Sequence, residues 1–401
     1  MSSSLNKLSN LFRSTTVTKP PKRTSNLPPK PTSKTSPKPA KPTSQSPKPP
    51  TKTQQSPPSQ PPRKFRLLSE KLKEASSAEK FRIYRANNYV RRLAAANQHS
   101  LIEEAVKHQE QVGDVNDVGL RTKLMAIYGR GGMFDNALRL FDEMPEKSCK
   151  SFNGLLAASL YAKKFDMTEK LFKELPEKYG FDVDLVSYNI LARSYCQSGS
   201  MDLALGVLVE MESNGVAPDL VTFNTLLVGL YRDKKLVEAE KLWSIMESKN
   251  FGPTVRSYDP KIKYLIENDQ IEEAVKVFDE MMSKGVKADR LSYYLFIKGY
   301  ADKGNLEETK RWYDKLSLDM VRPDRRIIKM VLPLVCEEGD LDYAVKLAKE
   351  SVTWRCIVNV QVLQDVVDKL VKASKIDEAK DLISLTESLH YYNKNLKLPA
   401  E

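Results

Sequence analysis

The sequence predicts an all-α protein, a right-handed superhelical solenoid of about nine helix-turn-helix repeats. Three observations support this fold class: an internal repeat, two apolar helical stripes within each repeat, and a small residue that recurs in phase. The repeat is clearest in Leu185–Asp219 and Leu220–Thr254, two adjacent segments of 35 residues with nearly the same pattern. Self-similarity at a fixed period of about 20 to 50 residues is typical of helical arrays.

Each repeat is expected to form two helices joined by a polar turn. In Leu185–Asp219, the apolar residues Tyr188, Leu191 and Tyr195 share one face of a first helix, because they lie at i, i+3 and i+7. The second helix carries its own apolar stripe, with Ala204 where the two helices must approach closely. The segment therefore predicts a helical hairpin.

The small residue at this contact recurs along the chain and sets the phase of the repeats. Its positions are Ala105, Ala137, Thr168, Ala204, Ala239, Ala274, Thr309, Ala344 and Ala379. From Ala204 onward the spacing is 35 residues throughout. We therefore expect a solenoid over residues 86–394, a helix over 65–85 that caps its open end, and a C-terminal tail over 395–401.

Charge and composition indicate where basic residues lie and argue against a membrane, metal-binding or disulfide-rich protein. Residues 1–69 hold 14 of the 64 basic residues and no acidic residue, so the rest of the chain carries 50 basic against 52 acidic side chains. No apolar run approaches the ~18 residues that span a bilayer, which predicts no membrane insertion. The four cysteines form no C-x-x-C pair, so we predict no metal site, no cofactor and no disulfide framework.

The N-terminal residues read as targeting and linker segments. Residues 1–19 are predicted to be an organelle transit peptide, because the start is Ser-rich, free of acid and amphipathic; a plain basic tail is the alternative. The short Leu/Phe/Arg start favours the mitochondrial matrix over the chloroplast. Residues 20–64 are rich in Pro, Lys and Ser and are predicted to be a disordered linker, or alternatively a basic arm that touches RNA or the ribosome.

The repeats resemble those of the pentatricopeptide repeat (PPR) family, P class. The resemblance rests on the 35-residue period, on the openings SYN and TFN, on FDEM and FKEL near the ends of units, and on the exits APD, KAD and RPD at Asp219, Asp289 and Asp324. The tetratricopeptide family is the near alternative, but its usual period is about 34 residues and it lacks the Pro-Asp exit. The resemblance covers about three quarters of the chain and implies a single-stranded RNA ligand.

In that family the fifth and last residues of a unit contact the base edge, and an apolar second residue packs on the base. The resemblance therefore implies RNA-binding roles for Asn153, Asp184, Val186, Asn189, Asp219, Val221, Asn224 and Thr254. The Asn/Asp combination implies uracil. The fifth position departs from the pattern at Val90, Thr122, Asp259, Tyr294, Lys329 and Gln364, and the second position at Arg256, Arg326 and Gln361. The alternative role for the asparagines is that of polar residues at helix starts.

Enzyme motifs are missing from the sequence: it has no P-loop, no G-x-S-x-G, no H-E-x-x-H and no deaminase-like tail. The segments Gly129–Pro145, Lys163–Pro176 and Val362–Ala379 look like the short plant mitochondrial PPR proteins that associate with the mitochondrial ribosome. This implies a non-catalytic RNA-binding or scaffold protein on the small subunit that supports mitochondrial translation. Its implied partners are ribosomal or messenger RNA and small-subunit proteins. The alternatives are an organelle mRNA-binding factor for transcript processing or stability, and a pure protein-docking scaffold.

Overall fold

The structure is a computed structural model that describes residues 61–76, 83–114, 116–356, 358–387 and 396–398. The predicted transit peptide and nearly all of the predicted linker lie outside these residues, as does most of the predicted tail. None of the helices in the described part is long and apolar enough to cross a membrane.

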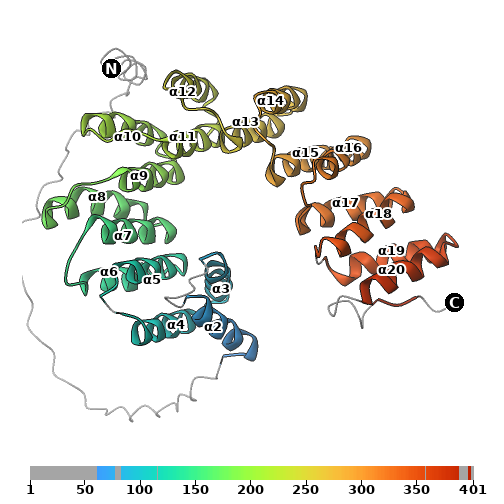
Figure 1. Cartoon of the computed structure of the whole chain (residues 1–401), viewed down its shortest axis with the longest axis horizontal. Helices are drawn as coiled ribbons and strands as arrows, with labels where there is room; N and C mark the ends of the chain where they lie inside the picture. Colours follow the sequence, from blue (N-terminus) through green and yellow to red (C-terminus); the bar gives the residue numbers. More distant parts are fainter. Residues whose placement is uncertain (1–60, 77–82, 115, 357, 388–395, 399–401) are drawn as a thin grey trace, which may run out of the picture. The chain divides into compact units, whose positions relative to one another are not determined.

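The described residues form 19 α-helices and contain no strand, which confirms the all-α repeat architecture (Figure 1). They are α2 (Arg63–Ala75), α3 (Ile83–Ala95), α4 (His99–Val112), α5 (Val118–Arg130), α6 (Phe134–Asp142), α7 (Cys149–Tyr161), α8 (Phe165–Tyr179), α9 (Leu185–Ser198), α10 (Met201–Ser213), α11 (Leu220–Arg232), α12 (Leu236–Ser248), α13 (Val255–Glu267), α14 (Ile271–Ser283), α15 (Arg290–Asp302), α16 (Leu306–Leu318), α17 (Arg325–Glu337), α18 (Leu341–Thr353), α19 (Val360–Lys372) and α20 (Ile376–Glu387). From α3 onward they form nine successive pairs of a first and a second helix.

The recurring small residue lies on the second helix of every pair. All nine of these side chains are at most 1% exposed. A larger side chain there would hold the two helices of a repeat apart, since helix cores are packed without spare volume. The predicted phase of the repeats is thereby confirmed.

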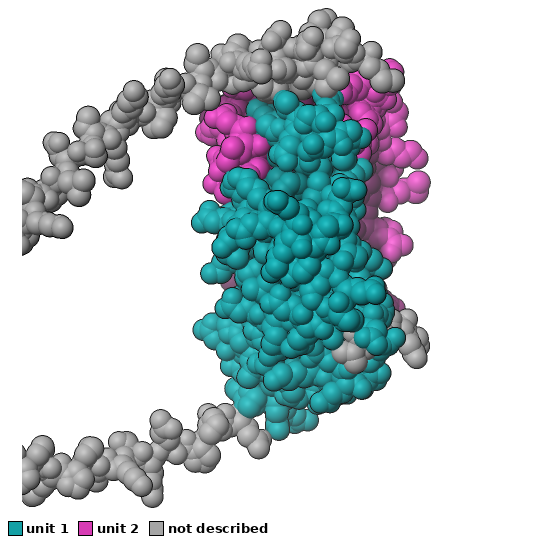
Figure 2. Space-filling view, turned by 90° about the vertical axis from the view of Figure 1, so that its left-hand side faces the viewer, with its two compact units in different colours: residues 1–191, 205–216 teal, residues 192–204, 217–401 magenta. Residues whose placement is uncertain are grey.

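The chain divides into two compact units, drawn in teal and magenta in Figure 2. Unit 1 contains the described residues up to 191 together with 205–216, and unit 2 contains 192–204 and those from 217 onward. Within unit 1, α2 packs on α3 and α4, and α5 packs on α7. Helix α2 ends at Ala75, whereas the capping helix was predicted over 65–85. Ser76 is the C-cap of α2, and the Ser76 hydroxyl donates to the carbonyl oxygen of Leu72.

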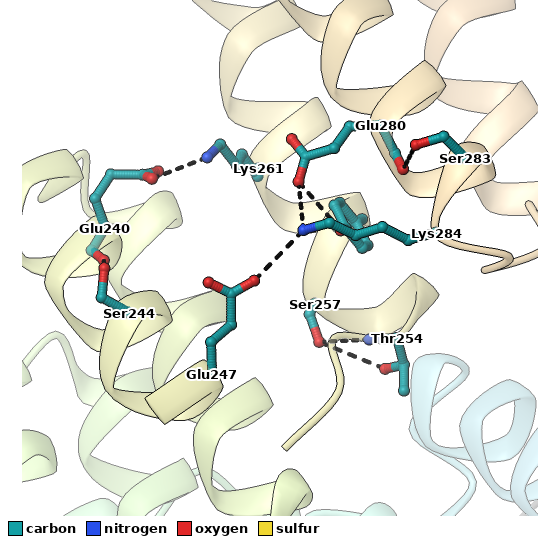
Figure 3. A network of polar contacts seen from close by, with 10 residues as sticks. Glu240, Ser244, Glu247, Thr254, Ser257, Lys261, Glu280, Ser283 and Lys284 are labelled. Atoms are coloured by element: carbon teal, nitrogen blue, oxygen red, sulfur yellow. Dashed lines mark hydrogen bonds and ion pairs between the residues drawn. The ribbon is translucent and has the colours of Figure 1, made fainter. Parts of the chain in front are cut away.

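In unit 2 the first helices form one row and the second helices another. The first helices α11, α13, α15, α17 and α19 pack in succession, and each second helix packs on its own first helix (Figure 1). Figure 3 shows part of the polar contacts between repeats, where Lys284 of unit 2 reaches both Glu247 and Glu280 at 3.5 and 2.8 Å. Such exposed ion pairs contribute about 0–1 kcal/mol each, so burial of the apolar stripes holds the rows together.

The last residue of a repeat begins the next first helix. Asp219, Thr254 and Asp289 are N-caps of α11, α13 and α15, and each forms a capping box with a Ser or Thr three residues later. Such a side chain satisfies amide groups that would otherwise lack a partner in the first turn of the helix. The Pro-Asp exit seen in the sequence is therefore a helix start signal.

Candidate nucleic-acid interface

The fifth residue of one repeat contacts the capping box that opens the next. In unit 1, the Nδ2 of Asn153 donates to the Asp184 carboxylate at 2.9 Å. The hydroxyl of Ser187 donates to the Oδ1 of Asn153 at 2.6 Å, and the Ser187 amide donates to Asp184 at 2.8 Å. The structure thus places the predicted residues Asn153 and Asp184 side by side.

Hydrogen bonds lower the pKa of Asp184 in this pair. Burial raises the pKa of Asp184, but donation from the Ser187 amide and the Asn153 side chain outweighs it, and the net pKa lies below the usual value. Asp184 is therefore a carboxylate at neutral pH. The Asn153 side chain already donates to Asp184 and accepts from Ser187. These hydrogen bonds serve the start of α9 rather than a ligand.

The same arrangement recurs in unit 2. Ser257 donates to the Oδ1 of Asn224 at 2.6 Å, while its Oγ accepts from the amide of Thr254 at 3.0 Å; Figure 3 labels Ser257 and Thr254. Within the described residues, the Nδ2 of Asn224 has no hydrogen-bond partner, unlike that of Asn153. Asn224 therefore keeps a free amide donor beside the start of α13.

One repeat further on, Asp259 takes the place of the asparagine. It accepts from the hydroxyl of Ser292 at 2.7 Å and is only 6% exposed. Burial raises its pKa to about 7; the Ser292 hydrogen bond lowers it and the charge of Asp289 raises it further. Burial therefore disfavours the ionised form of this carboxyl group in unit 2.

A groove of about 710 Å³ runs over the first helices of unit 2. Its walls come from the end of α9 and from α11, α13 and α15, and they include the predicted residues Val221 and Asn224. Val221 is 57% exposed, and Leu291, at the same second position of α15, is 42% exposed. The groove thus presents an apolar surface next to a free amide donor.

Several cations line the same groove. Arg193, Arg256 and Lys263 are exposed there. Lys263 lies 3.6 Å from Glu267, whereas Arg193 and Arg256 have no ion-pair partner in the part of the chain that the structure describes. The acidic residues of the groove are Asp259, Glu267 and Asp289. With Arg232, which pairs with Asp233, the lining holds four basic against three acidic side chains, whereas residues 70–401 as a whole carry a small acidic excess.

The sequence analysis did not predict the groove residues at the ninth position of the units. Arg193 and Lys263 are ninth residues of their units, as is Val228, which also lines the groove. Positions two, five and nine lie at i, i+3 and i+7, so they share one helix face. Extending the family's second and fifth positions by one helical turn would have found these residues.

The remaining predicted residues lie at the equivalent positions of α9 and α11. Val186 is 51% exposed and Asn189 is half-buried on α9, in unit 1. Asp219 in unit 2 caps α11 and accepts from the amide of Thr222 at 2.9 Å. Their roles in RNA binding stay predictions.

The fold and this groove define a class of protein: an α-helical repeat array with its candidate ligand surface on the first helices. A family model described as the PPR repeat family matches residues 183–232, 218–259 and 261–302, and a second, described as PPR repeat, matches 122–149. Over these residues the chain therefore carries pentatricopeptide repeats.

Curated relatives share part of the chain. The small ribosomal subunit protein mS79 (rPPR3b) of Arabidopsis thaliana is 41% identical over 157 residues, 38% of this chain and 40% of its own length. The small ribosomal subunit protein mS78 (rPPR3a) of the same plant is 40% identical over 153 residues, 37% of this chain and 38% of its own. The match thus spans about two fifths of these relatives. Among solved structures, the PPR10 protein from maize matches at 22% identity over 82% of this chain and 47% of its own, with a TM-score of 0.44.

Proposed function

We propose that the protein is a non-catalytic RNA-binding PPR protein of the mitochondrial matrix, associated with the small subunit of the mitochondrial ribosome and supporting mitochondrial translation. The observation that carries the RNA contact is the groove of unit 2. Support for the ribosomal assignment comes from the two relatives that are named as small ribosomal subunit proteins.

The chemistry of the groove suits single-stranded RNA. Exposed Val221 and Leu291 offer apolar faces on which a base can pack, and the free amide of Asn224 can donate to a base edge. Arg193 and Arg256 can neutralise phosphates, since no acidic side chain of the described residues pairs with them. The groove thus offers an apolar surface for the base, a donor for the base edge and cations for the phosphate on one face of unit 2.

Limited sequence specificity fits a ribosomal role. The fifth position is an asparagine at three consecutive repeats, Asn153, Asn189 and Asn224, and changes to Asp259 and Tyr294 thereafter. A ribosomal protein binds RNA at one site of an assembled particle. Contacts with neighbouring proteins can there supply the specificity that base contacts do not. The segments 1–19 and 20–64 would then serve import and act as a spacer.

The second candidate is an organelle mRNA-binding factor. The Asn153–Asp184 pair favours it, because the structure joins these two side chains directly and the family resemblance associates this pair with uracil. A pure protein-docking scaffold is the third candidate, and its groove in unit 2 would hold a partner protein, with RNA contact incidental.

Ultraviolet crosslinking in mitochondria from cells that express a tagged chain distinguishes these candidates. We expect small-subunit ribosomal RNA to dominate the crosslinked reads. Val221→Asp should lower the yield about tenfold, because it places a carboxylate where a base would stack. Dominance of messenger RNA would favour the second candidate.

Val237→Asp is the matched control for this experiment. Val237 is likewise the second residue of its helix, α12, and is 64% exposed, but it lies on a second helix away from the groove. We expect its crosslinking to equal that of the unchanged protein. An equal loss in both variants would show that added charge, rather than the groove, reduces RNA contact.

A further inference from the structure

The C-terminal ends of the second helices α16 and α18 carry large apolar side chains that lie in solvent. Met320 is 89% exposed and Leu318 is 81% exposed, and Trp354 is 42% exposed. Leu318 is the last residue of α16, and Trp354 is the C-cap of α18. All three residues belong to unit 2. Exposed apolar side chains that gather in one place mark an interaction site more often than scattered ones do.

Met320 and Arg355 lie at a backbone position that glycine or asparagine usually occupies. Two residues after the ends of α12, α14, α16 and α18 the backbone is left-handed, with φ of 62, 77, 53 and 53°. The residues at this position are Asn250, Gly285, Met320 and Arg355. Since the left-handed region disfavours most side chains, glycine would be less strained at 320 and 355. Strain of this kind is found at functional sites, which indicates a role for these two side chains outside the fold.

The ends of α16 and α18 lie close together because the two helices run side by side in the same direction. The hydroxyl of Tyr343 on α18 donates to the carboxylate of Asp314 on α16 at 2.8 Å. Further along both helices, the hydroxyl of Tyr313 donates to Glu350 at 2.6 Å. The exposed side chains that follow these contacts therefore belong to one surface of unit 2.

The loop that leaves α16 is held against the end of α18. The guanidinium of Arg322 lies over the ring of Trp354, with its Cζ 4.9 Å from the ring centroid. The Nε of Arg290 donates to the carbonyl oxygen of Arg322 at 2.8 Å, and the Sγ of Cys356 donates to that of Pro323 at 3.0 Å. This loop is thus ordered before any partner binds, which lowers the entropy cost of binding.

The charge of this surface is positive. Three arginines beside the apolar side chains have no ion-pair partner within the residues that the structure describes: Arg290, Arg322 and Arg355. The acidic residues of the loop that leaves α16 are already engaged, Asp319 by the hydroxyl of Tyr293 and Asp324 by the guanidinium of Arg326. A partner that matches this surface therefore carries carboxylates.

We propose that Leu318, Met320, Arg322, Trp354 and Arg355, here called the α16–α18 edge, dock an acidic segment of a partner protein that carries apolar side chains. Tryptophan, methionine and arginine are enriched in protein–protein interfaces, whereas interfaces with nucleic acids are more polar. The partner's apolar side chains pack on Leu318 and Met320, and its carboxylates pair with Arg322 and Arg355. The edge lies at the ends of second helices, so this inference goes beyond the proposed RNA contact of the groove.

Site-specific photocrosslinking tests the α16–α18 edge. Benzoylphenylalanine replaces Met320 in the tagged full chain, and the crosslinked partner is digested and sequenced by mass spectrometry after illumination of the cells. The matched control carries the same group at Asn250, which is exposed and has the same left-handed position two repeats earlier in unit 2. RNase treatment of the products distinguishes protein from RNA.

We expect position 320 to crosslink at least about fivefold more than position 250, to a peptide with a net negative charge and two or more large apolar residues. Replacing Arg322 and Arg355 together by glutamate should lower this yield about tenfold, because like charges would then face one another. Lys241→Glu should change it less than about twofold, since Lys241 is an exposed residue of α12, away from the α16–α18 edge.

Met320→Gly separates a binding role from a structural role. With the photoreactive group placed at Leu318, this variant should lower the crosslinking yield about fivefold, because an anchor side chain is lost. The midpoint of its thermal unfolding, followed by circular dichroism, should rise by about 2 °C, because glycine adopts the left-handed backbone without strain. A lower midpoint would show that the methionine serves the fold and would overturn the inference.

Several outcomes of the crosslinking would also overturn the docking surface: RNase-sensitive products, a basic peptide, equal yields at positions 320 and 250, or an unchanged yield in Met320→Gly. Failure of the proposed function would look different. An acidic peptide from a protein outside the ribosome would support the α16–α18 edge and contradict the ribosomal assignment. An acidic peptide from a small-subunit protein would support both.

Discussion

Gly129→Ala is expected to lower the free energy of unfolding by about 2 kcal/mol. A Cβ at Gly129 would lie 2.5 Å from both the Cα and the carbonyl oxygen of Ala158, where α5 crosses α7 in unit 1. Both atoms belong to the backbone, so no side chain can move aside. Overpacking costs up to about 3 kcal/mol, and the better helix propensity of alanine returns about 1 kcal/mol, so the clash prevails.

Gly206→Ala provides the opposite case within the same unit. Gly206 lies inside α10, is exposed, and would place a Cβ with no atom within 4 Å. Alanine there should stabilise the protein by about 0.5–1 kcal/mol. Urea denaturation followed by circular dichroism measures both changes. Equal stability of Gly129→Ala and the unchanged protein would contradict the close crossing of α5 and α7.

Asp259→Asn is expected to stabilise the protein at pH 8 and to have little effect at pH 4. The native pKa of Asp259 is raised to about 7, mainly by burial, against an ordinary value of 3.8. Between these values the native state keeps a proton that the unfolded state has lost. The free energy of unfolding therefore falls as pH rises from about 4 to 7, and the full cost is present above pH 7.

The size of this effect is bounded by the pKa difference. At 1.36 kcal/mol for each pKa unit, the upper limit is about 4 kcal/mol, and partial hydration reduces the expected gain to about 2 kcal/mol. Asparagine can accept the Ser292 hydrogen bond as Asn224 accepts that of Ser257. Thermal unfolding of both proteins from pH 4 to 8 measures the difference. Asp182→Asn, at an exposed loop residue, is the control, and a pH-independent gain in Asp259→Asn would contradict the buried charge.

The helical pairs were predictable because they depend on local pattern. The 35-residue period, the apolar stripes and the small residue at each helix contact are all visible within one repeat. The burial of Thr168 and Thr309 beside seven alanines shows that the slot selects for size rather than for chemistry. Thr168 keeps its hydroxyl satisfied by a hydrogen bond to Ser159 at 2.8 Å.

The use of the fifth residues was harder to predict, because it depends on contacts between repeats. Ser187 and Ser257 bind asparagines that lie 34 and 33 residues earlier, and no local pattern marks that contact. The groove likewise depends on side chains from four helices. Its cations at the ninth position were overlooked because the family pattern directs attention to the second, fifth and last residues.

Sedimentation of the tagged protein from purified mitochondria on sucrose gradients tests the proposed function most directly. Gradients are run with and without RNase and high salt, and small-subunit proteins mark the ribosomal fractions. We predict that the protein migrates with the small subunit and stays there at high salt, since many contacts with an assembled particle should hold it. Migration in light fractions that RNase dissolves would contradict ribosome association and would assign the protein to messenger RNA.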